Sequence, residues 1–381
     1  MYGEKILMTI RFTLRSLTVG AICASMIATG GCQSSPKRGK KGATSTTASK
    51  STGLAEQFEL GKRAVQAGKY SEAAKFFTQA AEQGHTAAQV QLGHLYLAGK
   101  GLPQDYSTAA TWFQRAAEKN SGEAQLQLAM MHSAGQGVVQ DPVLAFKWYE
   151  AAAQQGVAEA QAVLGEMYLN GQGVTRSPDE AINWFRKAVD QGNPQAAFQL
   201  ATLYDEGIAV PQNFKEAFRW YQLAAEKGIA KAQYALGLLY YTGRGTAQDF
   251  TQALKWYQLA AEQNITDAQN SLGLMYAEGH GVSANHKQAI EWYQKAAEQG
   301  HASAQANLAT MYRFGLGVER NYVTAYMWYA IAEAGFSSDN VGMQTASNIS
   351  MDQLRTKMTT QEITEAKQRA FDWRMKRMQG P

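Results

Sequence analysis

Hydrophobic and polar positions repeat with a period of 36 residues over residues 85–336. The seven copies begin at residues 85, 121, 157, 193, 229, 265 and 301. In every copy position 4 is Ala and position 8 is Leu, and position 12 is Tyr except at His132. These positions share one face of an α-helix, because residues four apart lie on the same side. We therefore predict an amphipathic first helix at positions 3–14 of each copy.

A turn and a second helix follow in every copy. Gly-x-Gly, with Ala209 replacing its second glycine in the fourth copy, can adopt positive φ and end the first helix. Asp or Asn at position 21, replaced by Ser177 in the third copy, is placed to cap the second helix. That helix carries Trp at position 28, another aromatic residue at position 29 and then Ala-Ala, so we expect the aromatic pair to fill the space between helices. The position-28 residues are Trp112, Trp148, Trp184, Trp220, Trp256, Trp292 and Trp328.

The recurring motifs A-x-x-x-L-G/A-x-x-Y, G-x-G-V and W-Y/F-x-x-A-A resemble those of the Sel-one-like repeat family, relatives of the tetratricopeptide repeats. The resemblance covers residues 85–336 and implies an all-α fold. This fold is a right-handed α-solenoid of stacked antiparallel helix pairs, with about eight repeats and C-terminal capping helices. Residues 54–84 lack Gly-x-Gly and resemble a tetratricopeptide unit, which we expect to be the N-terminal repeat.

Residues 337–381 depart from the 36-residue period. Ile363, Ala366, Ala370 and Trp373 recur at helical spacing behind Glu362. We predict capping helices here, because the last repeat of a solenoid otherwise exposes an apolar face. A basic tail at residues 374–377 is expected to follow them and includes Arg374, Lys376 and Arg377.

The N-terminus is typical of an export signal. Residues 1–31 combine basic residues, a short apolar stretch and small residues, which is the pattern of a secretory signal peptide. Thr29-Gly30-Gly31-Cys32 resembles a bacterial lipobox, which implies that Cys32 is lipidated, and Gln33 resembles an outer-membrane signal. Residues 32–53 are rich in Ser, Thr, Gly and Lys and are predicted to form a disordered linker. We therefore expect a lipoprotein of the bacterial cell envelope, in the outer membrane and facing the periplasm.

Charge is distributed unevenly along the chain. Of the 36 Lys and Arg residues eight precede residue 54, whereas only one of the 32 acidic residues does, so the remainder is slightly acidic. Nucleic-acid affinity depends on clustered cations, so we do not expect a nucleic-acid partner.

Catalytic and metal-binding patterns are not evident in the sequence. The only cysteines are Cys23 and Cys32, and no pair of histidines has the spacing of a zinc motif. A nucleophile elbow, a phosphate loop and a dinucleotide fingerprint are also missing. We expect neither enzymatic activity nor a cofactor or metal.

The irregular columns of the first helices are the candidates for function. We predict that positions 6, 10 and 13 line a concave inner groove, where exposed aromatic side chains would anchor a partner protein or peptide. The opposing interpretation is that some of these side chains pack against the next repeat. The candidate groove residues are Phe198, Asp205, Glu206, Tyr234, Leu238, Tyr241 and Arg313.

The resulting functional prediction is a non-enzymatic protein–protein interaction scaffold, anchored to the membrane through Cys32. One alternative is a carbohydrate- or peptidoglycan-binding module that uses the groove aromatics. A second is a cell-wall hydrolase or penicillin-binding enzyme. The Gln at position 5 of most copies could contact a ligand, but we expect it to bond the Gly-x-Gly loop or an adjacent helix.

Overall fold

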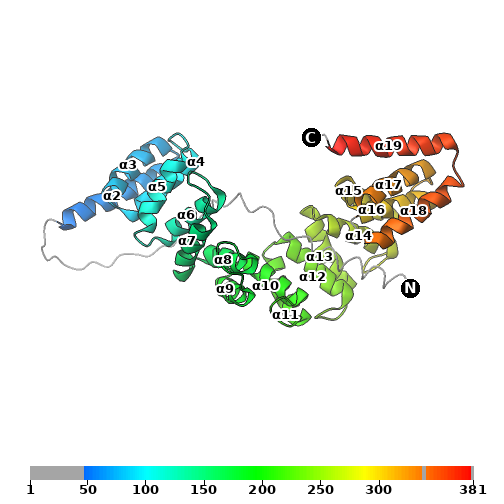
Figure 1. Cartoon of the computed structure of the whole chain (residues 1–381), viewed down its shortest axis with the longest axis horizontal. Helices are drawn as coiled ribbons and strands as arrows, with labels where there is room; N and C mark the ends of the chain where they lie inside the picture. Colours follow the sequence, from blue (N-terminus) through cyan, green and yellow to red (C-terminus); the bar gives the residue numbers. More distant parts are fainter. Residues whose placement is uncertain (1–46, 337–339, 379–381) are drawn as a thin grey trace. The chain divides into compact units, whose positions relative to one another are not determined.

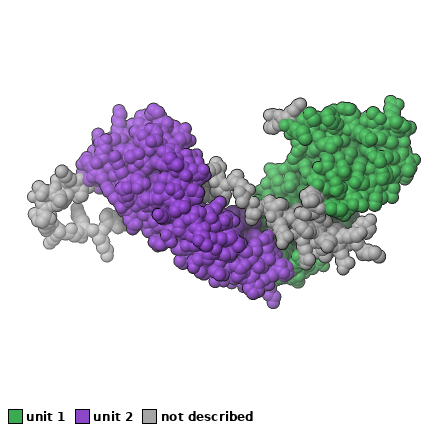
Figure 2. All heavy atoms as spheres, in the orientation of Figure 1, with its two compact units in different colours: residues 1–36, 230–381 green, residues 37–229 purple. Residues whose placement is uncertain are grey.

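The predicted helix pairs are confirmed in a computed structural model that describes residues 47–336 and 340–378 (Figure 1). These residues form helices and no strands, and they divide after Ile229 into two compact units, coloured separately in Figure 2. The described part of unit 2 consists of α2 (Thr47–Gln66), α3 (Tyr70–Glu82), α4 (Thr86–Ala98), α5 (Tyr106–Ala117), α6 (Gly122–Ala134), α7 (Pro142–Gln154), α8 (Ala158–Asn170), α9 (Pro178–Asp190), α10 (Pro194–Glu206) and α11 (Phe214–Glu226).

Unit 1 contains three further helix pairs and two terminal helices. Each even-numbered helix from α4 to α16 is the first helix of a 36-residue copy, and the following helix is its second. The helices of unit 1 are α12 (Ala230–Thr242), α13 (Phe250–Glu262), α14 (Thr266–Glu278), α15 (His286–Glu298), α16 (Ala302–Phe314), α17 (Tyr322–Gly335), α18 (Val341–Arg355) and α19 (Thr360–Met378).

The N-terminal boundary differs from the prediction. Helix α2 begins at Thr47, so residues 47–53 are helical although the sequence assigns them to the linker. Extending an existing helix by a residue is much easier than starting one, so the helix of the first pair can continue into a polar segment. The predicted signal peptide, Cys32 and the rest of the linker lie outside the described residues.

The second aromatic residue, and not the tryptophan, forms the centre of each repeat. Phe113 and Phe185 are completely buried on their second helices. The glycine at position 9 of the first helix leaves room for this ring, since an added Cβ on Gly93 would lie 2.7 Å from a ring carbon of Phe113. The close packing explains why position 9 holds only Gly or Ala.

The tryptophans are less buried than predicted. Trp328 is 5% exposed, but the other six position-28 residues are half-buried. Four of them, Trp112, Trp148, Trp184 and Trp292, pack at the edges of hydrophobic clusters. A cation lies over several of the six rings. The Nζ of Lys187, for example, lies 3.7 Å from the Trp184 ring centroid. A Trp half-covered by a cation keeps its indole face partly shielded from water.

The predicted turn and cap chemistry is confirmed. Gly135 and Gly137 have φ values of 69° and 70°, and Ala209 has a φ of 63° where other copies have their second glycine. At the start of the second helix, Asp141 Oδ1 accepts hydrogen bonds from the N–H groups of Val143 and Leu144, both at 3.0 Å. Equivalent side-chain caps occur on the second helices of the other six copies.

The buried glutamines connect neighbouring repeats, as predicted for position 5. Gln161 Nε2 donates to the carbonyl of Ala153 at 3.0 Å, in the last turn of the preceding repeat's second helix. Gln161 Oε1 accepts from Gln191 Nε2 at 2.7 Å. The first bond adds a second donor to a carbonyl at the end of the helix, which also accepts the N–H of Gly156 at 3.0 Å. The same pair of contacts occurs at Gln125 and Gln269.

Helices α18 and α19 cap the last repeat, as predicted. Ala366 and Ala370 of α19 are completely buried, and the Trp373 ring packs edge-on against Trp328 with centroids 5.8 Å apart. The predicted basic tail at residues 374–377 is not entirely free, because Arg377 is bound to the end of α15. Its guanidinium donates to the carbonyls of Glu298 and Gln299 at the C-terminus of α15. A cation at this position complements the negative end of the helix dipole.

Candidate docking surface

The accessible face of the first helices is offset from the face that the sequence indicated. Position 6 is buried in five of the seven copies. The reason is contact with the next repeat: Val90 packs with Ala124 and Leu128, and Leu126 packs with Ala160. Positions 3, 7, 10 and 14 lie together on the adjoining strip of the helix, and most of them are half-buried or exposed. These positions form the candidate docking surface.

The prediction that Tyr234 and Leu238 line a groove is wrong. Each side chain is only 6% exposed, so neither can anchor a partner by being buried on binding. Tyr234 lies in one hydrophobic cluster with Ala268 and Leu272 of the following repeat, and its ring centroid is 5.7 Å from that of Tyr257. The opposing interpretation, that these side chains belong to the core, holds at both positions.

The three candidates on α10 have different environments. Phe198 is half-buried, with its ring centroid 5.9 Å from that of Tyr221. Asp205 is also half-buried, and its carboxylate accepts a hydrogen bond from the Tyr221 hydroxyl at 3.4 Å. Burial and the nearby Asp205 carboxylate raise the pKa of the Tyr221 phenol well above its usual value. Glu206 is exposed.

Tyr241 of α12 belongs to a small aromatic cluster in unit 1. Its hydroxyl lies 3.2 Å from His280 Nδ1, and the His280 ring stacks on Phe250 with centroids 4.6 Å apart. Burial, followed by the charge of Glu278, raises the pKa of the Tyr241 phenol. Tyr241 therefore has partners within its own unit and is not an open anchor.

Arg313 of α16 is likewise engaged. Its guanidinium donates to the side chain of Gln353 on α18 and lies over the Phe314 ring, 4.8 Å from the centroid. The candidates predicted for one groove are thus distributed over both units, and within each unit most of them have intramolecular contacts.

The clearest feature of the accessible face is its charge in unit 2. Helices α4, α6, α8 and α10 contain five acidic residues and no Lys or Arg, whereas each of the second helices α5, α7, α9 and α11 carries at least one cation. We call this set of carboxylates the acidic face. It consists of Glu123, Glu159, Glu166, Asp205 and Glu206.

Of these five acids, only Asp205 and Glu206 are among the candidates predicted from the sequence. The signal for the others was available, since acids without compensating cations recur at positions 3, 10 and 14 of successive first helices. Their accessibility depends on which flank of the first helix the next repeat covers, and the aromatic columns do not indicate that flank.

Polar contacts between adjacent first helices shape the acidic face. His94 Nε2 lies 3.0 Å from Glu123 Oε1, and this hydrogen bond lowers the pKa of the Glu123 carboxyl. Glu166 Oε1 accepts from Gln199 Nε2 at 2.9 Å, yet burial raises the pKa of the Glu166 carboxyl. Glu159 and Glu206 are exposed.

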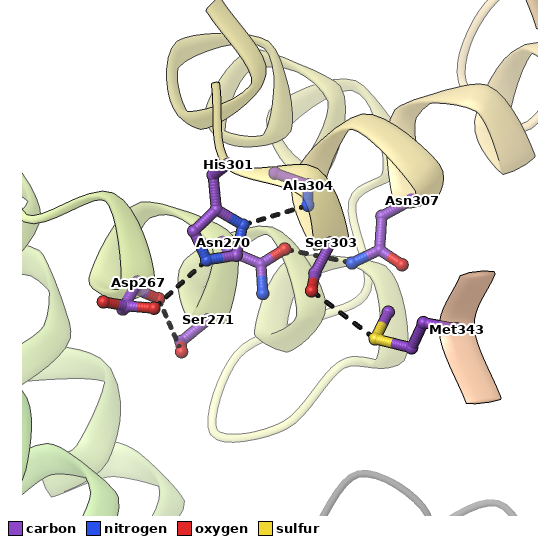
Figure 3. Close-up of polar contacts among 8 residues, drawn as sticks. All are labelled: Asp267, Asn270, Ser271, His301, Ser303, Ala304, Asn307 and Met343. Carbon is purple, nitrogen blue, oxygen red and sulfur yellow. Dashed lines mark hydrogen bonds and ion pairs between the residues drawn. The ribbon is translucent and has the colours of Figure 1, made fainter. Parts of the chain in front are cut away.

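In unit 1 the same positions carry one cation, Lys231, and two acids, Asp267 and Glu278, beside polar side chains, some of which Figure 3 shows. Asn307 Nδ2 of α16 donates to Asn270 Oδ1 of α14 at 3.0 Å. Beside this pair, His301 Nδ1 accepts the N–H of Ala304 at 3.1 Å, so its Nε2–H donates to Asp267 Oδ1, also at 3.1 Å. Both ring nitrogens are occupied by structural bonds, which leaves no free base for proton transfer.

Within the described ranges, no group of three or more His, Cys, Asp or Glu side chains could hold a metal ion. In the same ranges no helix has both the length and the apolar character needed to cross a bilayer.

Comparison with known proteins agrees with the repeat architecture. The Sel1 repeat model matches residues 57–85, 86–121, 122–157, 158–193, 194–229, 230–265, 266–301 and 302–334. The first matched stretch falls on the segment for which the sequence predicts a tetratricopeptide-like unit. No curated protein matches the chain.

Two solved structures share the fold over most of their lengths. One is a protective antigen present in uropathogenic Escherichia coli strains, with 28% identity and a TM-score of 0.54, covering 86% of this chain and 93% of that one. The other is a Sel1 repeat protein from Oxalobacter formigenes, with 30% identity and a TM-score of 0.57, covering 63% of this chain and 96% of that one. The eight matched repeats, the paired helices and these likenesses together show that the chain belongs to the Sel1 repeat family.

Proposed function

We propose that the protein is a non-enzymatic scaffold whose acidic face binds a basic segment of a partner protein. Sel1 repeat solenoids commonly serve as protein-interaction scaffolds, which supports the general role. The observation that carries the specific proposal is the charge separation in unit 2, where the first helices α4, α6, α8 and α10 together hold five acids and no Lys or Arg. A surface of one sign attracts a segment of the opposite sign and orients it before contact.

The enzymatic and glycan-binding alternatives receive less support. Both ring nitrogens of His301, for example, make structural hydrogen bonds, so this histidine is not available as a general base. A glycan platform would need exposed aromatic faces in the groove, but Tyr234 is buried. Protein docking needs only the polar surface that the first helices present.

The acidic-face proposal is tested with a labelled synthetic peptide rich in Lys and Arg. The triple substitution Glu123→Gln/Glu159→Gln/Glu206→Gln is expected to raise the peptide's Kd about tenfold, because each exposed pair contributes roughly 0.2–1 kcal/mol. Fluorescence anisotropy measures the binding, which should also weaken as salt concentration rises.

A matched control separates the acidic face from net charge. Glu82→Gln/Glu118→Gln/Glu226→Gln removes the same charge from exposed positions at the ends of second-helix segments of unit 2. This control should leave the Kd nearly unchanged. Equal weakening by both triple variants would show that only net charge attracts the peptide, and the proposal would fail.

We further propose that the scaffold is a lipoprotein of the bacterial cell envelope, anchored through Cys32 in the outer membrane and facing the periplasm. The sequence Thr29-Gly30-Gly31-Cys32 supports this proposal, and acyl chains on one residue can hold a protein at a bilayer. Globomycin, which blocks lipoprotein signal cleavage, should cause the full-length precursor to accumulate, and Cys32→Ser should release the protein from membranes. Normal maturation under globomycin would contradict the anchor.

A further inference from the structure

Helix α19 presents an exposed apolar stripe on a helix that otherwise serves as a cap. Phe371, Met375 and Met378 are 51%, 38% and 80% exposed. Their spacing of four and three residues places them on one face. Large apolar side chains exposed together on one helix face are uncommon on the surface of a soluble domain and indicate a binding surface.

The stripe points away from the repeats because the other side of α19 is occupied. Ala366 and Ala370 are completely buried, and Trp373 packs on Trp328 of α17. Arg377 is held by the carbonyls at the end of α15. Figure 1 shows α19 (red) at the C-terminal end of unit 1, with α15 and α17 on one side of it.

Positive charge borders one edge of the stripe. Residues 367–378 contain five Lys or Arg and a single acid, Asp372. Helix geometry places the exposed Lys367 and the half-buried Arg374 along one edge of the apolar residues, and Lys376 is exposed further round the helix. A helix with an apolar stripe bordered by cations is the pattern of a segment that lies in the headgroup region of a membrane.

We propose that α19 is a peripheral membrane-binding helix, which inserts Phe371, Met375 and Met378 among lipid headgroups while its cations contact anionic lipids. A stable protein–protein interface uses about 20–30 residues on each side, whereas this stripe has three apolar residues on one straight helix. A shallow row of that size is sufficient at a bilayer surface, where apolar insertion and attraction to anionic lipid act together. The inference goes beyond the proposed scaffold role and does not depend on the acidic face.

The test uses the full chain carrying Cys32→Ser, so that acylation cannot contribute. Its co-sedimentation is measured with vesicles of phosphatidylcholine alone and of phosphatidylcholine with phosphatidylglycerol. The protein should bind the anionic vesicles and bind the neutral ones much more weakly. Phe371→Ser/Met375→Ser should reduce binding to the anionic vesicles about tenfold, and Lys367→Gln/Lys376→Gln should reduce it roughly fivefold per lysine removed.

The control variant is Val139→Ser/Val143→Ser, which removes two exposed apolar side chains from unit 2 and should bind like the parent. The basic residues of the leader are common to all variants, so they do not affect these differences. Circular dichroism checks that each variant keeps its helix content. Unchanged vesicle binding by Phe371→Ser/Met375→Ser would overturn the proposal. So would a parent dimer in analytical ultracentrifugation that this variant lacks, since a second copy would then cover the stripe.

Discussion

Replacing Tyr234 with alanine is expected to lower the free energy of unfolding of unit 1 by about 3–5 kcal/mol, the usual cost of removing a large buried aromatic ring. The side chain is 6% exposed and packs with Ala268 and Leu272 of the next repeat. Its removal leaves a cavity at a junction between repeats, where each repeat depends on its neighbour for burial. The effect should therefore spread to the adjacent helix pair.

Urea unfolding followed by circular dichroism measures this loss. Phe314→Ala is the matched control in the same unit, because Phe314 is 58% exposed, and it should cost less than about 1 kcal/mol. If Tyr234→Ala and Phe314→Ala have equal and small effects, Tyr234 is accessible after all. The groove predicted from the aromatic columns would then be restored.

Gly137→Ala is expected to lower the free energy of unfolding by about 3 kcal/mol or more. A left-handed backbone conformation costs an L-residue roughly 1–2 kcal/mol, and Gly137 has a φ of 70°. The remainder comes from collision, because an ideal Cβ would lie 2.3 Å from the carbonyl carbon and oxygen of Tyr106 in the preceding repeat. Backbone atoms cannot move aside as a flexible side chain can.

Two further variants separate conformation from collision. Gly156 also has positive φ, 85°, but nothing lies within 4 Å of its Cβ site, so Gly156→Ala should cost only roughly 1–2 kcal/mol. The reverse change Ala209→Gly relieves a strained φ of 63° and should stabilise unit 2 by about 1 kcal/mol. Thermal and urea unfolding of the three variants check the order. Equal losses for Gly137→Ala and Gly156→Ala would contradict the close approach.

Much of the fold was predictable because its causes are local. Gly-x-Gly ends a helix through backbone conformation, and Asp141 caps the next one through bonds to residues two and three positions away. The apolar stripe of Ala, Leu and Tyr selects one face of the first helix without reference to any other helix. The sequence assigned residues 47–53 to the linker, but they belong to α2, because a helix can extend into polar sequence once it has formed.

The candidate site was less predictable because it depends on contacts between repeats. A periodic pattern identifies the face that packs inside a repeat but does not show which flank the next repeat covers. The position-6 flank, with Val90 and Tyr234, is the one covered. That arrangement buried the predicted anchor Tyr234, and it left the acids at positions 3 and 14 exposed.

The sequence by itself determined the repeat length, the helix pairs, the turns and caps, and the family, since each depends on residues within one 36-residue unit. Only the tertiary structure decided that the second aromatic residue, and not the tryptophan, is the centre of each repeat. It also decided that Arg377 closes α15 and that Glu123, Glu159 and Glu206 are exposed. The physical reason is that burial and charge clustering depend on the packing of neighbouring helices, and residues distant in sequence set that packing.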